Sequence, residues 1–308
     1  MNENLKRLIT LILVSALIMI GCASTASKQG ARSINTYYVR ANGNDSNNGL
    51  TENTAFMTIE RAIQAASASR TKQITVIGTL RGNTIIRDSG TAEILITGKP
   101  DAHENEKAIL IPTNPLLFEI LGNSKIRFEN ITLQGTSGVN NAISQGIAVN
   151  GSEVVVTLGR NVLITQFFSN DGAGIFLQVG NIHMTDNATI ARNVARNSGG
   201  GIYINRGSLV MDSNSSIRDN EARSTASIDR GGGGIFIWAG NVNISGNSLI
   251  TGNRAAVLGG GIYCAGGLII NGVSILDMEG GGQWGEVHTF KTGNIHSNSS
   301  HDVYENYN

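Results

Sequence analysis

Carboxylates and arginines are the side chains of this sequence that could carry acid–base chemistry. General acid–base catalysis needs at least two such groups within hydrogen-bond reach of one reacting bond. When the internal repeats of the chain are aligned, neither Asp212 nor Asp219 has a second carboxylate in its outward column. The other members of these columns are Thr185, Ser245 and Asn271 for the first, and Arg192 and Gly252 for the second. Four scattered arginines are expected to be solvated: Arg196, Arg206, Arg218 and Arg230. The sequence therefore predicts no catalytic residue.

Aromatic side chains recur at equivalent positions of the repeats and could bind a ligand. One lies two residues after the glycine that opens each repeat: Phe176, Tyr203, Phe236 and Tyr263. Trp238 follows two residues after Phe236. Flat aromatic faces suit sugar rings or a partner protein, but stacked aromatics on neighbouring strands also stabilise a sheet by about 0.2–1 kcal/mol per pair. The column is interpreted either as a binding surface or as cohesion within the sheet.

Possible metal ligands are present, but their spacing is unspecific. The segment GNDSNNG at residues 43–49 holds one carboxylate, Asp45, and is either a Ca²⁺ ligand set or an asparagine-rich turn. His288, His296 and His301 lie in an irregular C-terminal tail. Cys264 has no second cysteine nearby for a redox or zinc motif. The sequence predicts neither a metal site nor a cofactor.

An internal repeat of about 27 residues determines which side chains can share a surface. GIFL begins at residue 174 and GIYI at residue 201, 27 residues later, and GIFI and GIYC follow at residues 234 and 261. Each repeat contains three short segments of alternating apolar residues. One such unit cannot bury its apolar face alone, so the units must stack. The pattern predicts an all-β fold, a right-handed parallel β-helix with three strands per coil.

Strand alternation assigns the side chains that point into this β-helix. One inward column is expected to contain Ile175, Ile202, Ile235 and Ile262, and a second Leu177, Ile204, Ile237 and Cys264. A third is expected to run through Met184, Met211, Ile244 and Ile270. Asparagines also recur once per repeat, and we interpret them as ladders of side-chain amides at the corners of the coils: Asn187, Asn214 and Asn247, and Asn193, Asn220 and Asn253.

The β-helix is expected to occupy residues 73–276, with seven or eight coils. Residues 35–72 are expected to form an entry strand and a capping helix, in which Thr58 caps the amphipathic segment IERAIQAAS. Residues 277–308 are expected to form an irregular C-terminal cap. Both ends need covering because an open coil exposes unpaired strand edges. Residues 221–230 lengthen one repeat and are expected to form a protruding loop.

The N-terminal segment indicates export. Lys6 and Arg7 precede an apolar run at residues 8–20, which is short for a membrane span but typical of a secretory signal peptide. The run ends in MIGC, which resembles the lipobox of bacterial lipoproteins and implies lipidation of Cys22. We therefore expect a signal peptide at residues 1–21 and a flexible tether at residues 22–34. An ordinary signal peptide is the alternative.

Two further segments resemble known families. YYVRANGNDSNNG at residues 37–49, followed by FMTI, resembles the entry motif of bacterial pectate-lyase-like right-handed β-helix proteins. The GGGI and IxxN motifs are similar to repeats of polymorphic outer-membrane proteins, with Ile190, Ile217 and Ile250 where that family has Phe. The resemblance implies a pectin-lyase-type scaffold at the bacterial surface. Enzymes of the pectate-lyase kind use Ca²⁺ held by clustered carboxylates, with an Arg or Lys base.

The charge balance limits the class of partner. The chain has 23 basic and 23 acidic residues, so no overall field would attract nucleic acid. We expect a lipoprotein of the cell envelope, in the outer membrane and at its surface, which contacts the membrane through lipid on Cys22. Its expected role is non-catalytic binding, adhesion or structure, with a carbohydrate or a host or envelope protein as partner. A polysaccharide lyase or glycoside hydrolase is the alternative.

Overall fold

The computed structural model describes residues 36–69, 72–89, 92–136, 142–225 and 230–265, and the short strands at 269–271, 295–296 and 303–305. The predicted signal peptide, the tether and Cys22 lie outside these residues. So do residues 226–229 of the predicted loop and most of the predicted C-terminal cap. Among the described helices, none is long and apolar enough to span a membrane.

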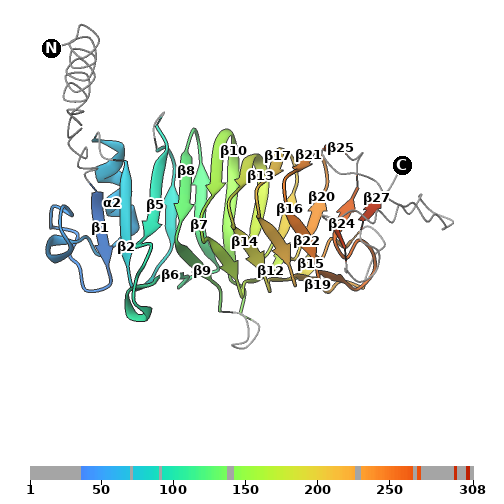
Figure 1. Ribbon diagram of the computed structural model, residues 1–308, viewed down its shortest axis with the longest axis horizontal. Coiled ribbons are helices and arrows are strands. Elements are labelled where there is room, and N and C mark those ends of the chain that lie inside the picture. The colour runs from blue at the N-terminus through green and yellow to red at the C-terminus, as the bar shows by residue number, and fades with distance from the viewer. Residues whose placement is uncertain are drawn as a thin grey trace, which may run out of the picture. The chain divides into compact units, whose positions relative to one another are not determined.

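Three sheets of parallel strands form a β-solenoid of about six turns, with a spacing near 29 residues. Figure 1 shows the turns stacked in sequence order from β1 to β24. The first sheet follows the path β1 (Thr36–Arg40), β2 (Gln73–Ile77), β5 (Ile94–Gly98), β8 (Lys125–Glu129), β10 (Gln145–Leu158), β13 (Ile175–Met184), β16 (Ile202–Ile204), β20 (Ile235–Ile237), β24 (Ile262–Cys264) and β27 (Val303–Glu305). Off this path it includes β4 (Thr84–Ile86), β7 (Leu116–Leu121), β17 (Ser208–Met211), β21 (Asn241–Ile244) and β25 (Ile269–Asn271).

The other two sheets complete each turn. The second sheet contains β3 (Thr79–Arg81), β6 (Ala108–Ile111), β9 (Ile131–Gln134), β11 (Leu163–Thr165), β14 (Thr189–Ala191), β18 (Ser216–Arg218), β22 (Leu249–Thr251) and β26 (Ile295–His296). The third contains β12 (Phe168–Asp171), β15 (Val194–Ser198), β19 (Glu221–Ala222) and β23 (Arg254–Ala255). Because β26 pairs with β22 and β27 with β24, two sheets continue into the segment beyond residue 276.

The predicted β-helix is confirmed, but the number of turns is smaller than expected. The upstream turns are longer than 27 residues. One includes the 3₁₀ helix η2 (Glu104–Glu106), and β10 alone runs for 14 residues. The expected number assumed that the spacing of the downstream repeats holds throughout. The GI-aromatic motif that sets this spacing is absent upstream of residue 146, so the sequence offered no measure of the longer turns.

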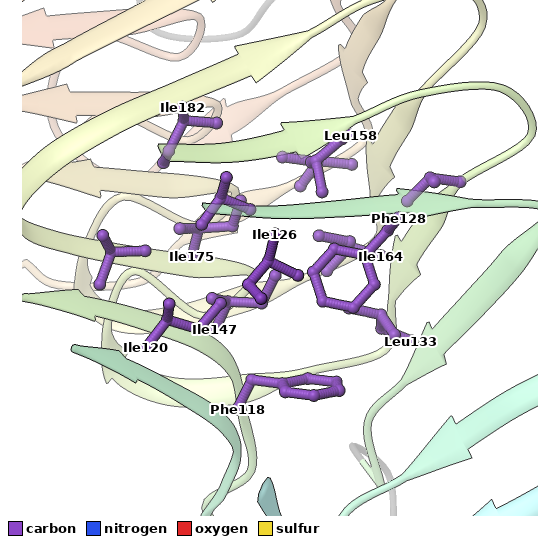
Figure 2. Packing of buried hydrophobic residues seen from close by; sticks show 14 of the residues in the cluster. Phe118, Ile120, Ile126, Phe128, Leu133, Ile147, Leu158, Ile164, Ile175 and Ile182 are labelled. Carbon is purple, nitrogen blue, oxygen red and sulfur yellow. The ribbon is translucent and has the colours of Figure 1, made fainter. Parts of the chain in front are cut away.

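Inward columns of apolar residues form one continuous core. The expected pairing of Ile175, Ile202, Ile235 and Ile262 is confirmed, and all four side chains are fully buried. Figure 2 shows how isoleucines from successive turns, such as Ile120, Ile147 and Ile175, converge in the interior. Cys264 is a buried free thiol in its expected column. Each buried side chain of this size contributes roughly 1.5–3 kcal/mol, so the stacked columns are the main source of stability.

In the last turn, the expected register is wrong by two residues. Ile270 pairs with Val242 rather than Ile244, and Asn271 therefore pairs with Asn243 rather than following Ser245. A slip of two residues keeps every side chain on its original face of the strand, because side chains alternate with a period of two. The apolar alternation of this segment therefore fits both registers equally well.

A short helix covers the first turn, as expected. Helix α2 (Ile59–Ser67) begins after Thr58, whose hydroxyl accepts a hydrogen bond from the Arg61 backbone N–H. It buries its predicted apolar face of Ile59, Ala62, Ile63 and Ala66.

The segment before the helix is tied to it by one carboxylate. Asp45 Oδ1 accepts hydrogen bonds from the backbone N–H groups of Met57 (2.8 Å) and Thr58 (2.9 Å), and Oδ2 accepts one from the Thr58 hydroxyl at 2.8 Å. The short helix η1 (Glu52–Thr54) lies between them. Because both carboxylate oxygens already hold the entry segment to α2, the turn interpretation of GNDSNNG is confirmed.

Buried asparagines connect the corners of successive turns. The Asn220 side-chain oxygen accepts hydrogen bonds from the Asn193 backbone N–H and side-chain amide, both at 3.0 Å, and its own amide donates to Ile190 O and to Asn253 Oδ1. All three asparagines are completely buried. The residues just before them have positive φ, which Gly252 (φ 67°) adopts without steric cost. This ladder is confirmed. In the second column, Asn247 bonds to Asn214 and Asn187 to Asn161.

Candidate functional site

The predicted aromatic column is a ladder of stacked rings on the first sheet. Phe176, Tyr203, Phe236 and Tyr263 occupy paired positions on β13, β16, β20 and β24. Their ring centroids are 5.1, 4.8 and 5.1 Å apart, and the interplanar angles are 12°, 15° and 4°. The backbone register extends the column to Tyr304 on β27, which the sequence analysis missed because the register was not followed past residue 276.

The ladder is less open than expected for a binding platform. Phe236 is 2% exposed and Tyr263 is fully buried, and the two pack with Tyr203, Leu258 and Ala265. A sugar ring binds to the face of an aromatic ring. Here the faces of the two central rings are covered by their neighbours in the stack. The geometry therefore gives the ladder cohesion within the sheet, which was one of the two interpretations from the sequence.

Trp238 differs from the ladder because its side chain is 52% exposed. It lies one residue beyond β20, and its backbone N–H donates to Ile204 O at 2.7 Å. The next residue, Ala239, donates to Asn205 O at 3.0 Å. These two bonds hold the backbone on both sides of the indole against the preceding turn. Trp238 is thus a large aromatic side chain in solvent on a rigid support.

Charged residues lie along one edge of the ladder. Burial raises the pKa of the Tyr203 hydroxyl, the charge of Asp171 raises it further, and the charge of Arg230 partly opposes the rise. Asp171 accepts hydrogen bonds from the Ser198 backbone N–H at 3.1 Å and from the Asn197 amide at 3.3 Å. Arg230 is the last residue of the lengthened repeat, so the end of this predicted loop lies near Tyr203.

A second polar group gathers side chains from several turns on the first sheet. His183 Nε2 and Asp212 Oδ2 are 2.8 Å apart. Arg127 and His183 share a column, because both pair with Thr157. Arg127 bonds to Glu129 at 2.7 Å, and its Nη2 is 3.8 Å from Asp186 Oδ2. The sequence analysis missed this group because it did not align the turn of Arg127 with the downstream repeats.

The environment of Asp212 favours its charged form. Partial burial tends to raise the pKa of this carboxyl, but hydrogen bonds from Thr185, His183 and Ser213 lower it overall. The group therefore presents a carboxylate, an imidazole and a guanidinium on neighbouring turns. Those are the residue types from which an acid–base site is built.

The other residues considered for chemistry are separate in the structure. Asp219 forms a surface ion pair with Arg218 at 2.7 Å. The Arg196 guanidinium lies over the Phe168 ring at 5.0 Å, and Arg206 is exposed. His288 and His301 are outside the described residues, and His296 lies in β26. In the part of the chain that the structure describes, no three His, Cys, Asp or Glu side chains are grouped to bind a metal.

Comparison of the chain with family models, curated proteins and solved structures gives no match in any of the three. A relation to pectate-lyase-like or polymorphic outer-membrane proteins therefore rests on the sequence motifs alone. What the structure adds is the parallel β-solenoid, the stacked ladder and the exposed Trp238 beside it.

Proposed function

We propose that this chain is an exported lipoprotein of the bacterial envelope whose β-solenoid is a non-catalytic binding module for carbohydrate. The signal-peptide pattern and the lipobox-like MIGC support export and anchoring through Cys22. The resemblance to the entry motif of pectate-lyase-like proteins and to polymorphic outer-membrane repeats supports a place in the outer membrane, at the cell surface. Adhesion to a host or envelope protein is the alternative role of the same surface.

The observation that carries this proposal is the exposure of Trp238. A half-exposed indole leaves apolar surface in water, which a bound sugar ring would cover while its hydroxyl groups bond to polar neighbours. Asn205 lies beside it on the preceding turn, and Arg206 follows. The rigid turn beneath the indole lowers the entropy cost of binding, because little side-chain or loop ordering is needed.

Replacing Trp238 by Ala should weaken glycan binding on the order of tenfold, since stacking on an aromatic face contributes about 1–1.5 kcal/mol. The measurement is titration of the full chain in detergent against a panel of neutral and acidic polysaccharides. Leu249→Ala is the matched control, because Leu249 is also an exposed apolar residue but lies on the second sheet. Equal binding by wild type and Trp238→Ala, or equal loss in the control, would contradict the proposal.

Polysaccharide cleavage is a second candidate function, favoured by the group of Arg127, His183 and Asp212. It brings a base and a carboxylate from different turns to one face. The same titrations can be followed for unsaturated products and new reducing ends, with and without Ca²⁺. Product formation that disappears in Asp212→Asn would replace the binding function by an enzymatic one.

Replacing Cys22 by Ser should move the protein out of the detergent phase or leave its precursor unprocessed. The reason is that lipid chains contribute about 0.8 kcal/mol per buried CH₂ group, and no other residue is placed to carry them. Phase partitioning and the mass of the N-terminal peptide measure this. Cys264→Ser is the control, because Cys264 is buried in the solenoid. If the Cys22 variant partitions like the wild type, the chain is not a lipoprotein.

A further inference from the structure

Two cavities lie between the capping helix and the first turns of the solenoid. Helix α2 packs against β4, and β4 pairs only with β7 among the strands that the structure describes. One cavity of about 160 Å³ has apolar walls that include Leu80, Leu110 and Leu117. The other, about 700 Å³, is wider and includes Ser67 and Arg87 in its lining. Both lie at the opposite end of the solenoid from Trp238.

Glu60 is the residue that borders both cavities. It belongs to the first turn of α2 and is half-buried. Burial raises the pKa of its carboxyl, the hydrogen bonds from its own backbone N–H and from Thr84 oppose the rise, and the charge of Asp45 adds to it. No ion pair involves Glu60 within the described residues. Arg81 also lines the smaller cavity, but it is exposed.

A partly desolvated carboxylate without a cation is unfavourable unless something compensates it. Neither the folding of α2 nor the packing of β4 needs a carboxylate at this position, because the helix is already capped by Thr58 and Asp45. The Ser67 hydroxyl, which lines the wider cavity, is also buried and has no hydrogen-bond partner in the described part of the chain. The cleft therefore offers one uncompensated charge and one unused polar atom beside an apolar chamber.

The size of the smaller cavity limits the ligand. An enclosed apolar space of about 150 Å³ accommodates a benzene ring, so 160 Å³ fits a body of six or seven carbon atoms. A polysaccharide chain does not fit. We propose that this cleft binds a small primary amine, with its apolar body among Leu80, Leu110 and Leu117 and its ammonium group on the Glu60 carboxylate. The site is independent of the glycan-binding surface around Trp238.

Benzylamine is the probe, and benzyl alcohol is its neutral counterpart. Titration of the full chain in detergent, followed by calorimetry or by shifts of NMR resonances, should detect the amine and not the alcohol at equal concentration. Glu60→Gln should weaken amine binding by about ten- to a hundredfold, the usual effect of a hydrogen bond to a charged group. Glu153→Gln is the control, because Glu153 is an exposed carboxylate on β10.

The comparison of the two probes on the unmodified chain tests the charge requirement without any substitution. Equal binding of amine and alcohol would overturn the role of Glu60, and the absence of binding by either would overturn the site. The Glu60→Gln variant should unfold at a temperature no lower than wild type at pH 7. A carboxyl whose pKa is raised in the folded state loses stability as pH rises above its usual value, and the amide removes that loss. Loss of glycan binding in this variant would show that the two sites are coupled.

Discussion

Replacing Asn220 by Ala should lower the free energy of unfolding by about 3–5 kcal/mol. The substitution removes the acceptor of two hydrogen bonds from Asn193 and the donor to Ile190 O and Asn253 Oδ1. Each buried polar group left without a partner costs about 1–3 kcal/mol, and these groups have no access to water. The shift of the urea midpoint, with the slope of the transition, measures the loss.

Asn247→Ala provides the matched control for this prediction. Asn247 is exposed and bonds through its side-chain amide to Asn214 at 3.3 Å. Its removal should change stability by less than about 0.5 kcal/mol, as for most surface substitutions. If both variants lost the same small amount, the buried ladder would be replaceable by water. An intermediate loss with a lower slope would indicate unfolding of individual turns.

Replacing Phe236 by Ala should cost about 3–5 kcal/mol and leave glycan binding per folded molecule unchanged. The ring is 2% exposed and stacks on Tyr203 at 4.8 Å and on Tyr263 at 5.1 Å. Deletion of a buried phenylalanine ring typically costs this amount, through lost burial and the cavity that remains. Thermal and urea unfolding give the stability, and titration of the folded fraction gives the binding.

The same substitution at Trp238 should have the opposite pair of effects. Because the indole is 52% exposed, Trp238→Ala should change stability by less than about 1 kcal/mol while it weakens binding. The two variants thus separate cohesion of the sheet from recognition. A loss of binding in Phe236→Ala at full folding would instead assign recognition to the ladder. A large loss of stability in Trp238→Ala would mean that the indole supports the turn.

The fold could be predicted from the sequence because the downstream repeats share a glycine and an apolar alternation. Those two signals are sufficient to pair Ile175 with Ile202 and Ile235, and to place Cys264 in the core. They could not fix the last turn, where a shift of two residues keeps the apolar face of Ile270 unchanged. They also could not count the upstream turns, since no common motif marks where each of those begins.

The candidate site was harder to predict than the core. The sequence identified which aromatic residues share a column, but not that neighbouring chain would bury Phe236 and Tyr263. The pairing of His183 with Asp212 depends on side chains 29 residues apart that meet only in the folded register. Glu60 carried no signal at all, because an acidic residue in the first turn of a helix is ordinary.

The buried asparagine ladder makes each turn interchangeable with the next. Asn193 and Asn220 are 27 residues apart and have equivalent partners, so residues 193–219 begin and end at the same hydrogen-bonding position. A tandem duplication of the corresponding gene segment would present a matching amide at both of its new junctions. The chain can therefore evolve a longer or shorter solenoid in whole turns, while the aromatic ladder gains or loses one ring at each step.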